Sequence, residues 1–164
     1  MNLKVAYLTP VNPYDKKVLS GVPYSVLRTL NKHFEHVDVL GPLSYSNSFT
    51  RLVRRISGRL KRKYNLNHSY YLAWWFSRKF GKMLKGKKYD IIFAPRMATE
   101  IALLKTNIPI VYYTDTTFIS FYNYYEWFSN FMSVSVWEGN RIEQNAISKS
   151  SILVFSSEWA ANSA

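Results

Sequence analysis

Leu-Lys-Val-Ala-Tyr-Leu-Thr-Pro at residues 3–10, followed across a loop by Ser-Gly-Val-Pro-Tyr-Ser-Val-Leu at residues 20–27, sets the architecture of this chain. The first segment has the apolar and aromatic composition of a buried strand. The second predicts the start of a helix, because Pro23 suits the first helical turn, where a missing N–H costs nothing. The apolar residues of this helix then share one stripe: Val26, Leu27, Leu30 and Phe34. A strand that leads into a helix in this way is typical of the opening of a nucleotide-fold α/β domain.

The rest of the chain alternates short apolar runs with helical patterns. Further strands are predicted at 37–41, 90–94, 108–114 and 152–156, and their β-branched and aromatic residues suit burial on both faces. Helical patterns occupy about 48–62, Ser69 to Leu84 and 137–149. Because such alternation produces parallel strands joined by crossover helices, we expect an α/β fold. Specifically, we expect a Rossmann-like three-layer sandwich with a mostly parallel sheet, forming one domain over 1–164 with a basic helical insertion at about 44–88.

Composition limits the class of protein. The 164 residues are 48% hydrophobic, enough for one domain that buries roughly two thirds of its unfolded surface. The absence of cysteine excludes disulfides, cysteine-ligated zinc and a thiol nucleophile. No run of about 18 apolar residues predicts a membrane span, and the N-terminus lacks the pattern of an export signal. We therefore expect a cytoplasmic protein.

The positive charge is concentrated in one segment. Of the 22 Lys and Arg residues, 13 lie between Arg51 and Lys88, where there is no Asp or Glu. The first helical pattern there is amphipathic and carries five of these cations: Arg51, Arg54, Arg55, Arg59 and Arg62. The second pattern adds Trp74 and Trp75. This combination predicts a helix pair on an anionic membrane surface, while a nucleic acid, a phosphorylated substrate or a merely solvated face remain alternatives.

Two loops are candidates for ligand binding. Gly21 and Val22 lie between the first strand and the first helix, where free backbone N–H groups suit an anion or a sugar hydroxyl, although a glycine there is also an ordinary turn residue. Gly21 lacks the companion glycines of a dinucleotide-binding motif, so NAD and FAD are not expected. Thr114, Asp115 and Thr116 follow a strong strand at the edge where α/β sheets bind ligands. Asp115 suits orienting a hydroxyl or accepting its proton, or alternatively capping the following turn or helix.

Aromatic residues crowd the segment 118–131, where they are eight of fourteen residues. They cannot all be buried in a small core, so they predict a sugar-stacking acceptor pocket or a lipid interface, or else packing against a neighbouring domain. Apart from His33 and His36, which flank Glu35 near a helix end, the histidines have no partners at metal-ligand spacing. We expect surface positions for the histidines and solvated side chains for Glu138 and Glu143. Ser157 follows the last strand, where it suits a helix N-cap or a ligand contact.

The order and spacing of three segments resemble the acceptor-side, N-terminal domain of a GT-B glycosyltransferase of family four (glycosyl transferases group 1). The segments are the opening strand with 20–23, the strand pair 89–95 and 108–115, and the helix and strand of 141–159. The resemblance implies transfer of a sugar from a nucleotide-sugar donor to a carbohydrate or glycolipid acceptor, with retention of configuration and without a metal or other cofactor. It further implies a C-terminal nucleotide-sugar domain that is absent from these 164 residues, so we expect the isolated chain to be inactive.

The resemblance also assigns roles to single residues. Gly21 would lie near the donor diphosphate or the acceptor, and Asp115 takes the place where many relatives have a histidine that contacts the transferred sugar, a departure from the family pattern. The cationic segment fits attachment to the inner face of the membrane, which relatives with lipid or polysaccharide acceptors use. The alternative function is a non-enzymatic module that binds a membrane surface or a nucleic acid.

Overall fold

The computed structural model describes residues 3–43, 45 and 62–164. It contains one five-stranded sheet with the strand order β2-β1-β3-β4-β5, in which every pairing is parallel. The strands are β1 Lys4–Leu8, β2 His36–Leu40, β3 Ile91–Pro95, β4 Ile110–Thr114 and β5 Ile152–Phe155. The predicted α/β, Rossmann-like fold is confirmed, and each strand lies within two residues of its predicted position.

The helices connect these strands in the expected way. They are α1 Val22–His33, α3 Tyr70–Leu84, α4 Ala98–Ile101, α5 Phe118–Phe121, α6 Ser133–Lys149 and α7 Glu158–Ala161, with 3-10 turns at Val18–Gly21, Leu66–His68 and Glu126–Phe128. The helix predicted at 137–149 begins four residues earlier, at Ser133. The helix predicted at 48–62 lies mostly outside the described residues, and so do Arg51, Arg54, Arg55 and Arg59.

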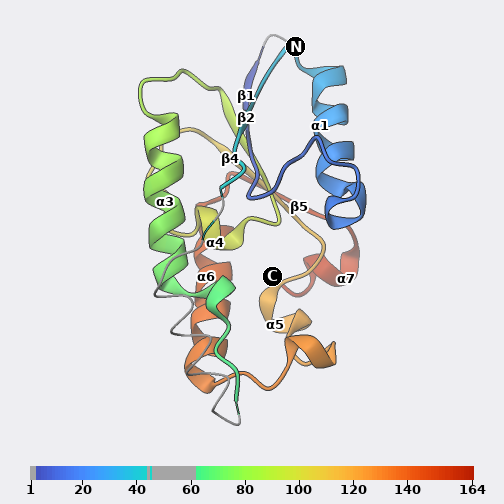
Figure 1. Ribbon diagram of the computed structural model, residues 1–164, viewed down its shortest axis with the longest axis vertical. Coiled ribbons are helices and arrows are strands. Elements are labelled where there is room, and N and C mark those ends of the chain that lie inside the picture. The colour runs from blue at the N-terminus through green and yellow to red at the C-terminus, as the bar shows by residue number, and fades with distance from the viewer. Residues whose placement is uncertain (1–2, 44, 46–61) are drawn as a thin grey trace.

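Helices cover both faces of the sheet, with α1 on one side and α3, α4 and α6 on the other (Figure 1). Alternation along β1 sends Tyr7 toward α1, where it packs with Leu27 and Leu30, while Ala6 and Leu8 join the larger core on the opposite face. The predicted three-layer arrangement therefore follows from side chains that alternate along strands buried on both faces.

The expectation of burial on both faces is wrong for β5. Ile152, Leu153 and Val154 are 52%, 36% and 39% exposed, whereas β1 and β4 are mostly buried. β5 is an edge strand, and of the described helices α7 packs beside it without covering these side chains. Composition alone does not distinguish an apolar edge strand from an apolar central one.

Ser69 starts α3 as predicted, and its hydroxyl caps the helix by accepting from the Leu72 N–H at 3.3 Å. The inward side of α3 is apolar: Leu72, Ala73, Phe76, Phe80 and Leu84. Among the described residues, no helix combines the length and the apolar composition needed to cross a membrane.

Candidate functional site

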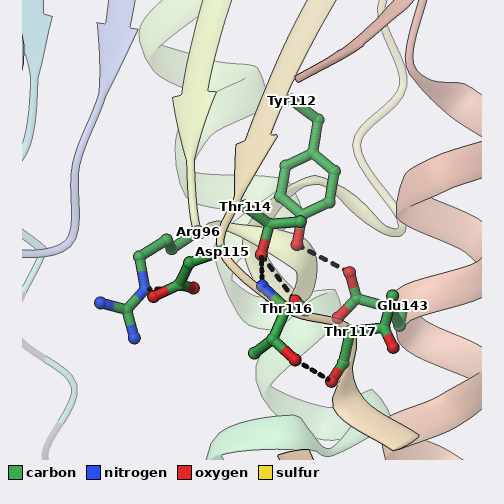
Figure 2. Close-up of polar contacts among 7 residues, drawn as sticks. All are labelled: Arg96, Tyr112, Thr114, Asp115, Thr116, Thr117 and Glu143. Atoms are coloured by element: carbon green, nitrogen blue, oxygen red, sulfur yellow. Dashed lines mark hydrogen bonds and ion pairs between the residues drawn. The ribbon is translucent and has the colours of Figure 1, made fainter. Parts of the chain in front are cut away.

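The carboxyl edge of the sheet gathers the loops that follow the strands. The strand order reverses between β1 and β3, and ligands of open α/β sheets bind outside the carboxyl ends of the strands near such a reversal. Arg96 directly follows β3, Asp115 directly follows β4, and Ser157 lies just beyond β5. The topology therefore brings polar residues from three segments to one edge, and Figure 2 shows two of them, Arg96 and Asp115.

Asp115 forms an ion pair with Arg96, whose Nε lies 3.4 Å from Asp115 Oδ1. Arg96 has a left-handed backbone with φ of 57°, and its N–H donates to Tyr113 O at 2.7 Å. Both charged side chains are 45% exposed, so the pair contributes at most about 1 kcal/mol to stability. The carboxylate is thus directed by Arg96 while staying accessible to a ligand.

The capping role considered for Asp115 is wrong. The N-cap residue of α5 is Thr117, and Asp115 makes no side-chain hydrogen bond to the described backbone. Instead, the neighbouring threonines stabilise the turn: Thr114 Oγ1 donates to Thr116 O at 2.8 Å, and Thr117 Oγ1 lies 3.0 Å from Ser163 Oγ. Figure 2 shows this turn between the Arg96–Asp115 pair on one side and Glu143 on the other.

Two hollows adjoin Asp115. One, of about 250 Å³, extends from Arg96 and Asp115 past Phe121 and Trp127 to His68 and Glu143. The other, of about 400 Å³, is bounded by the aromatic side chains of Tyr124, Tyr125 and Trp159. Asp115, Thr116 and Phe121 line both hollows. We call the two together the carboxyl-edge site.

The predicted site residues are only partly brought together. Thr114, Asp115 and Thr116 line the carboxyl-edge site. Gly21 and Val22 do not; Gly21 is the N-cap of α1 and has a left-handed φ of 77°. Ser157 is the N-cap of α7, where its hydroxyl accepts from the Ala160 N–H at 3.2 Å, so the capping role is confirmed and a ligand contact stays a prediction.

Glu143 is buried, and the expectation of a solvated side chain is wrong. It is 4% exposed on α6, and Tyr112 Oη donates to its Oε1 at 2.7 Å. Burial raises the pKa of Glu143 to about 7, although the hydrogen bonds from Tyr112 and from the Phe118 N–H oppose this shift. Glu143 therefore adds a carboxyl group at the floor of the site that can hold or release a proton near neutral pH.

The sequence contained a signal for this position. Gly139, Ile142, Glu143 and Ala146 follow the i, i+3, i+4, i+7 spacing of the buried stripe of α6. A charged residue within such a stripe points at the core.

His68 is half-buried against aromatic rings, which corrects the prediction of a surface position. Its ring is 5.1 Å from that of Phe118 and 5.7 Å from that of Phe128, and its Nδ1 is 3.2 Å from Asn65 Nδ2. Burial lowers the pKa of His68 to about 4, so the imidazole is neutral at pH 7. A neutral ring can offer a hydrogen bond to a ligand without adding charge. No spacing in the sequence indicated this position, since the contacts come from a segment 50 residues away.

The aromatic segment 118–131 is divided between core and surface. Phe118, Phe128 and Phe131 are buried and form a small core of their own. Tyr124 and Trp127 are each 66% exposed. The prediction that these rings cannot all be buried is confirmed.

The outer side of α3 carries a basic and aromatic surface, which we call the α3 surface: Trp74, Arg78, Lys79, Lys82 and Lys85. Trp74 is 49% exposed, and the Arg78 guanidinium lies 5.2 Å from its ring centre. The other predicted tryptophan, Trp75, is half-buried against the core with Lys79 over its ring. None of these cations forms an ion pair within the described residues.

Within the part of the chain that the structure describes, no group of three or more His, Asp or Glu side chains is placed to hold a metal ion. Comparisons of this chain with protein-family models, curated proteins and solved structures found no match. A function can therefore be proposed only from the geometry of the described residues.

Proposed function

We propose that this chain is the acceptor-side domain of a GT-B glycosyltransferase, which acts with a second domain to move a sugar from a nucleotide-sugar donor to a carbohydrate or glycolipid acceptor with retention of configuration. The observation that carries the proposal is the position of Asp115, an accessible carboxylate between two hollows with aromatic walls. Aromatic faces stack on the apolar faces of sugar rings, while a carboxylate accepts hydrogen bonds from sugar hydroxyls.

Each side chain of the site has a role in this proposal. Asp115 orients an acceptor or donor hydroxyl, and Arg96 fixes the direction of that carboxylate through its ion pair. Phe121 and Trp127 provide the stacking surface beside it. Glu143, which burial keeps protonated up to about neutral pH, suits donation of a hydrogen bond at the floor of the site.

The test is sugar transfer by the complete natural protein. Nucleotide release from UDP-, GDP-, ADP- and dTDP-sugars is measured in the presence of glycan and glycolipid acceptors, for wild type and for Asp115→Ala. We expect turnover to fall at least tenfold in the variant, since misplacing a reacting group can cost roughly 10²-fold. Asp90→Ala is the matched control, because Asp90 precedes β3 at the opposite edge of the sheet. Equal turnover in wild type and Asp115→Ala refutes the role of Asp115, and wild-type protein inactive on every donor refutes the proposal.

A second candidate function, attachment to an anionic membrane, is favoured by the α3 surface. Trp74, Arg78, Lys82 and Lys85 follow a single helical stripe, so one exposed side of α3 presents an aromatic ring and several cations. Each cation near an acidic leaflet contributes about 1 kcal/mol. This surface would hold the carboxyl-edge site near a lipid-linked acceptor.

Vesicle flotation tests the attachment. We expect binding to vesicles that contain phosphatidylglycerol and none to neutral vesicles, with a loss of binding in Lys82→Glu/Lys85→Glu. The matched control is Arg28→Glu/Lys32→Glu, which changes the net charge equally on α1, across the sheet. An equal loss of vesicle binding in both variants would show that net charge, and not the α3 surface, causes the attachment. Tighter binding to single-stranded nucleic acid than to vesicles would favour a nucleic acid as the partner.

A further inference from the structure

A third and larger hollow lies away from Asp115. Its volume is about 760 Å³, and it is bounded by the start of α6, the segment 119–131 and Arg62. Nothing in the proposed chemistry at Asp115 uses it. We call it the α6 hollow.

One stripe of α6 forms a wall of this hollow. Ser133, Val136, Trp137 and Asn140 follow the i, i+3, i+4, i+7 spacing, and all four line it. The facing wall is held in place by a parallel bridge between Lys63 and Phe131, in which the Lys63 N–H donates to Asn130 O and the Met132 N–H donates to Lys63 O, both at 2.9 Å. Main-chain pairing thus fixes the position of Lys63, the neighbour of Arg62 in the chain.

The lining combines three kinds of group. Trp137 is 60% exposed and offers a broad aromatic face. Asn123 and Asn140 offer amides that both donate and accept, and the half-buried amide of Asn140 makes no hydrogen bond to the described residues. Arg62 adds one guanidinium, which is the only ionised side chain among the described lining residues.

This combination selects a class of ligand. A sugar ring has apolar faces for an indole and hydroxyl groups that need both donors and acceptors, and a guanidinium pairs with a carboxylate through two parallel hydrogen bonds. A nucleic acid would need several cations along its phosphates, and a lipid chain would need an apolar lining. We propose that the α6 hollow binds an acidic sugar, a hexuronic acid residue of a glycan, with Trp137 under the ring and Arg62 on the carboxylate.

The α6 hollow shares a wall with the carboxyl-edge site. Phe121 lines the site, while its neighbour Tyr122 lines the hollow, so α5 separates the two. An acceptor glycan that extends past α5 would reach both. The identity of the hollow as an acceptor subsite rests on the proposed function, whereas its affinity for hexuronic acids does not.

Ligand-observed NMR tests the binding directly. The probes are methyl glycosides of glucuronic, galacturonic, mannuronic and iduronic acid, each compared with its neutral hexose. We expect at least one acid to bind more tightly than its neutral counterpart, Trp137→Ala to weaken that binding about tenfold or more, and Arg62→Ala to remove the preference for the acid. Val134→Ala is the control, because Val134 is exposed on the same helix outside the hollow. Circular dichroism checks that each variant folds.

Asp115→Ala separates this inference from the proposed function. We expect hexuronic acid binding to persist in Asp115→Ala even where sugar transfer is lost. Failure of all four acids to bind overturns the inference, and so does binding that is lost in Asp115→Ala but retained in Trp137→Ala. Transfer activity with no acid binding would leave the proposed function standing without this subsite.

Discussion

Gly139 and Gly81 both lie within helices, yet we expect opposite effects when each is replaced by alanine. A Cβ at Gly139 would lie 2.3 Å from two ring carbons of Phe118, whereas a Cβ at Gly81 would meet nothing within 4 Å. Ordinary contact begins near 3.4 Å, so the Phe118 ring would have to move by about 1 Å. The ring is 3% exposed and packed against His68 and Phe128, which leaves it little room.

Two opposing terms set the change in the free energy of unfolding. Replacing glycine by alanine inside a helix stabilises by about 1 kcal/mol, and overpacking a filled core costs about 1–3 kcal/mol. Gly81→Ala has only the first term, so we expect stabilisation of roughly 0.5–1 kcal/mol. Gly139→Ala has both. Because a buried ring would have to move by about 1 Å, we place the overpacking cost in the upper part of its range, at about 2–3 kcal/mol, and expect a net loss of about 1–2 kcal/mol.

Urea unfolding followed by circular dichroism measures both variants, with the slope against urea checked for constancy. Phe118→Leu should relieve the clash, so the double variant with Gly139→Ala should be less destabilised than the sum of the two single variants. A Gly139→Ala protein as stable as wild type would refute the packing of Phe118 on α6. That result would also contradict the described position of Phe118 in the wall of the carboxyl-edge site.

Three further predictions concern named side chains. Ser69→Ala should cost about 1–2 kcal/mol in urea unfolding because the buried hydroxyl caps α3 and donates to Leu66 O at 2.7 Å, whereas Ser77→Ala at an exposed position should change little. The free energy of unfolding of wild type, relative to that of Glu143→Gln, should fall by up to roughly 1.4 kcal/mol per pH unit as the pH rises from about 4.5 to 7. The reason is that the folded protein retains a proton on Glu143 that the unfolded chain releases. A free-energy difference that does not change with pH would contradict the burial of this carboxyl. The imidazole of His68 should titrate near pH 4 by NMR, and a midpoint at its ordinary value of 6.5 would show that the ring is solvated.

The sheet could be predicted from the sequence because each strand is a short apolar run with helical patterns on either side. The start of α6 could not, because Ser133, Val134, Ser135 and Val136 alternate polar and apolar like a strand, and no side chain caps the helix at Met132. Packing of α6 against α4 and α5, which the sequence does not reveal, favours a helix there. The local pattern of polar and apolar residues therefore does not predict the first turn of α6, because tertiary packing decides its conformation.

The candidate site was predictable in part for a related reason. Asp115 follows a strong strand, and a residue in that place lies at the ligand-binding edge of a parallel sheet. Arg96 has the same relation to β3, and the same rule could have found it. The partnership of Glu143 with Tyr112 could not be read from either segment alone, because it joins a helix to a strand 31 residues apart.

The aromatic segment 118–131 connects the two proposals. Its buried rings, Phe118, Phe128 and Phe131, form a wall that Gly139 allows to approach α6 closely. Its other rings then face different spaces, with the exposed Trp127 at the carboxyl-edge site and the half-buried Tyr122 at the α6 hollow. Packing and ligand binding were alternative interpretations of so many aromatic residues, but one segment can serve both, since the buried rings hold the exposed ones in place. A substitution that loosens the buried rings should therefore weaken ligands on both sides of the wall, whereas one at an exposed ring should affect one side alone.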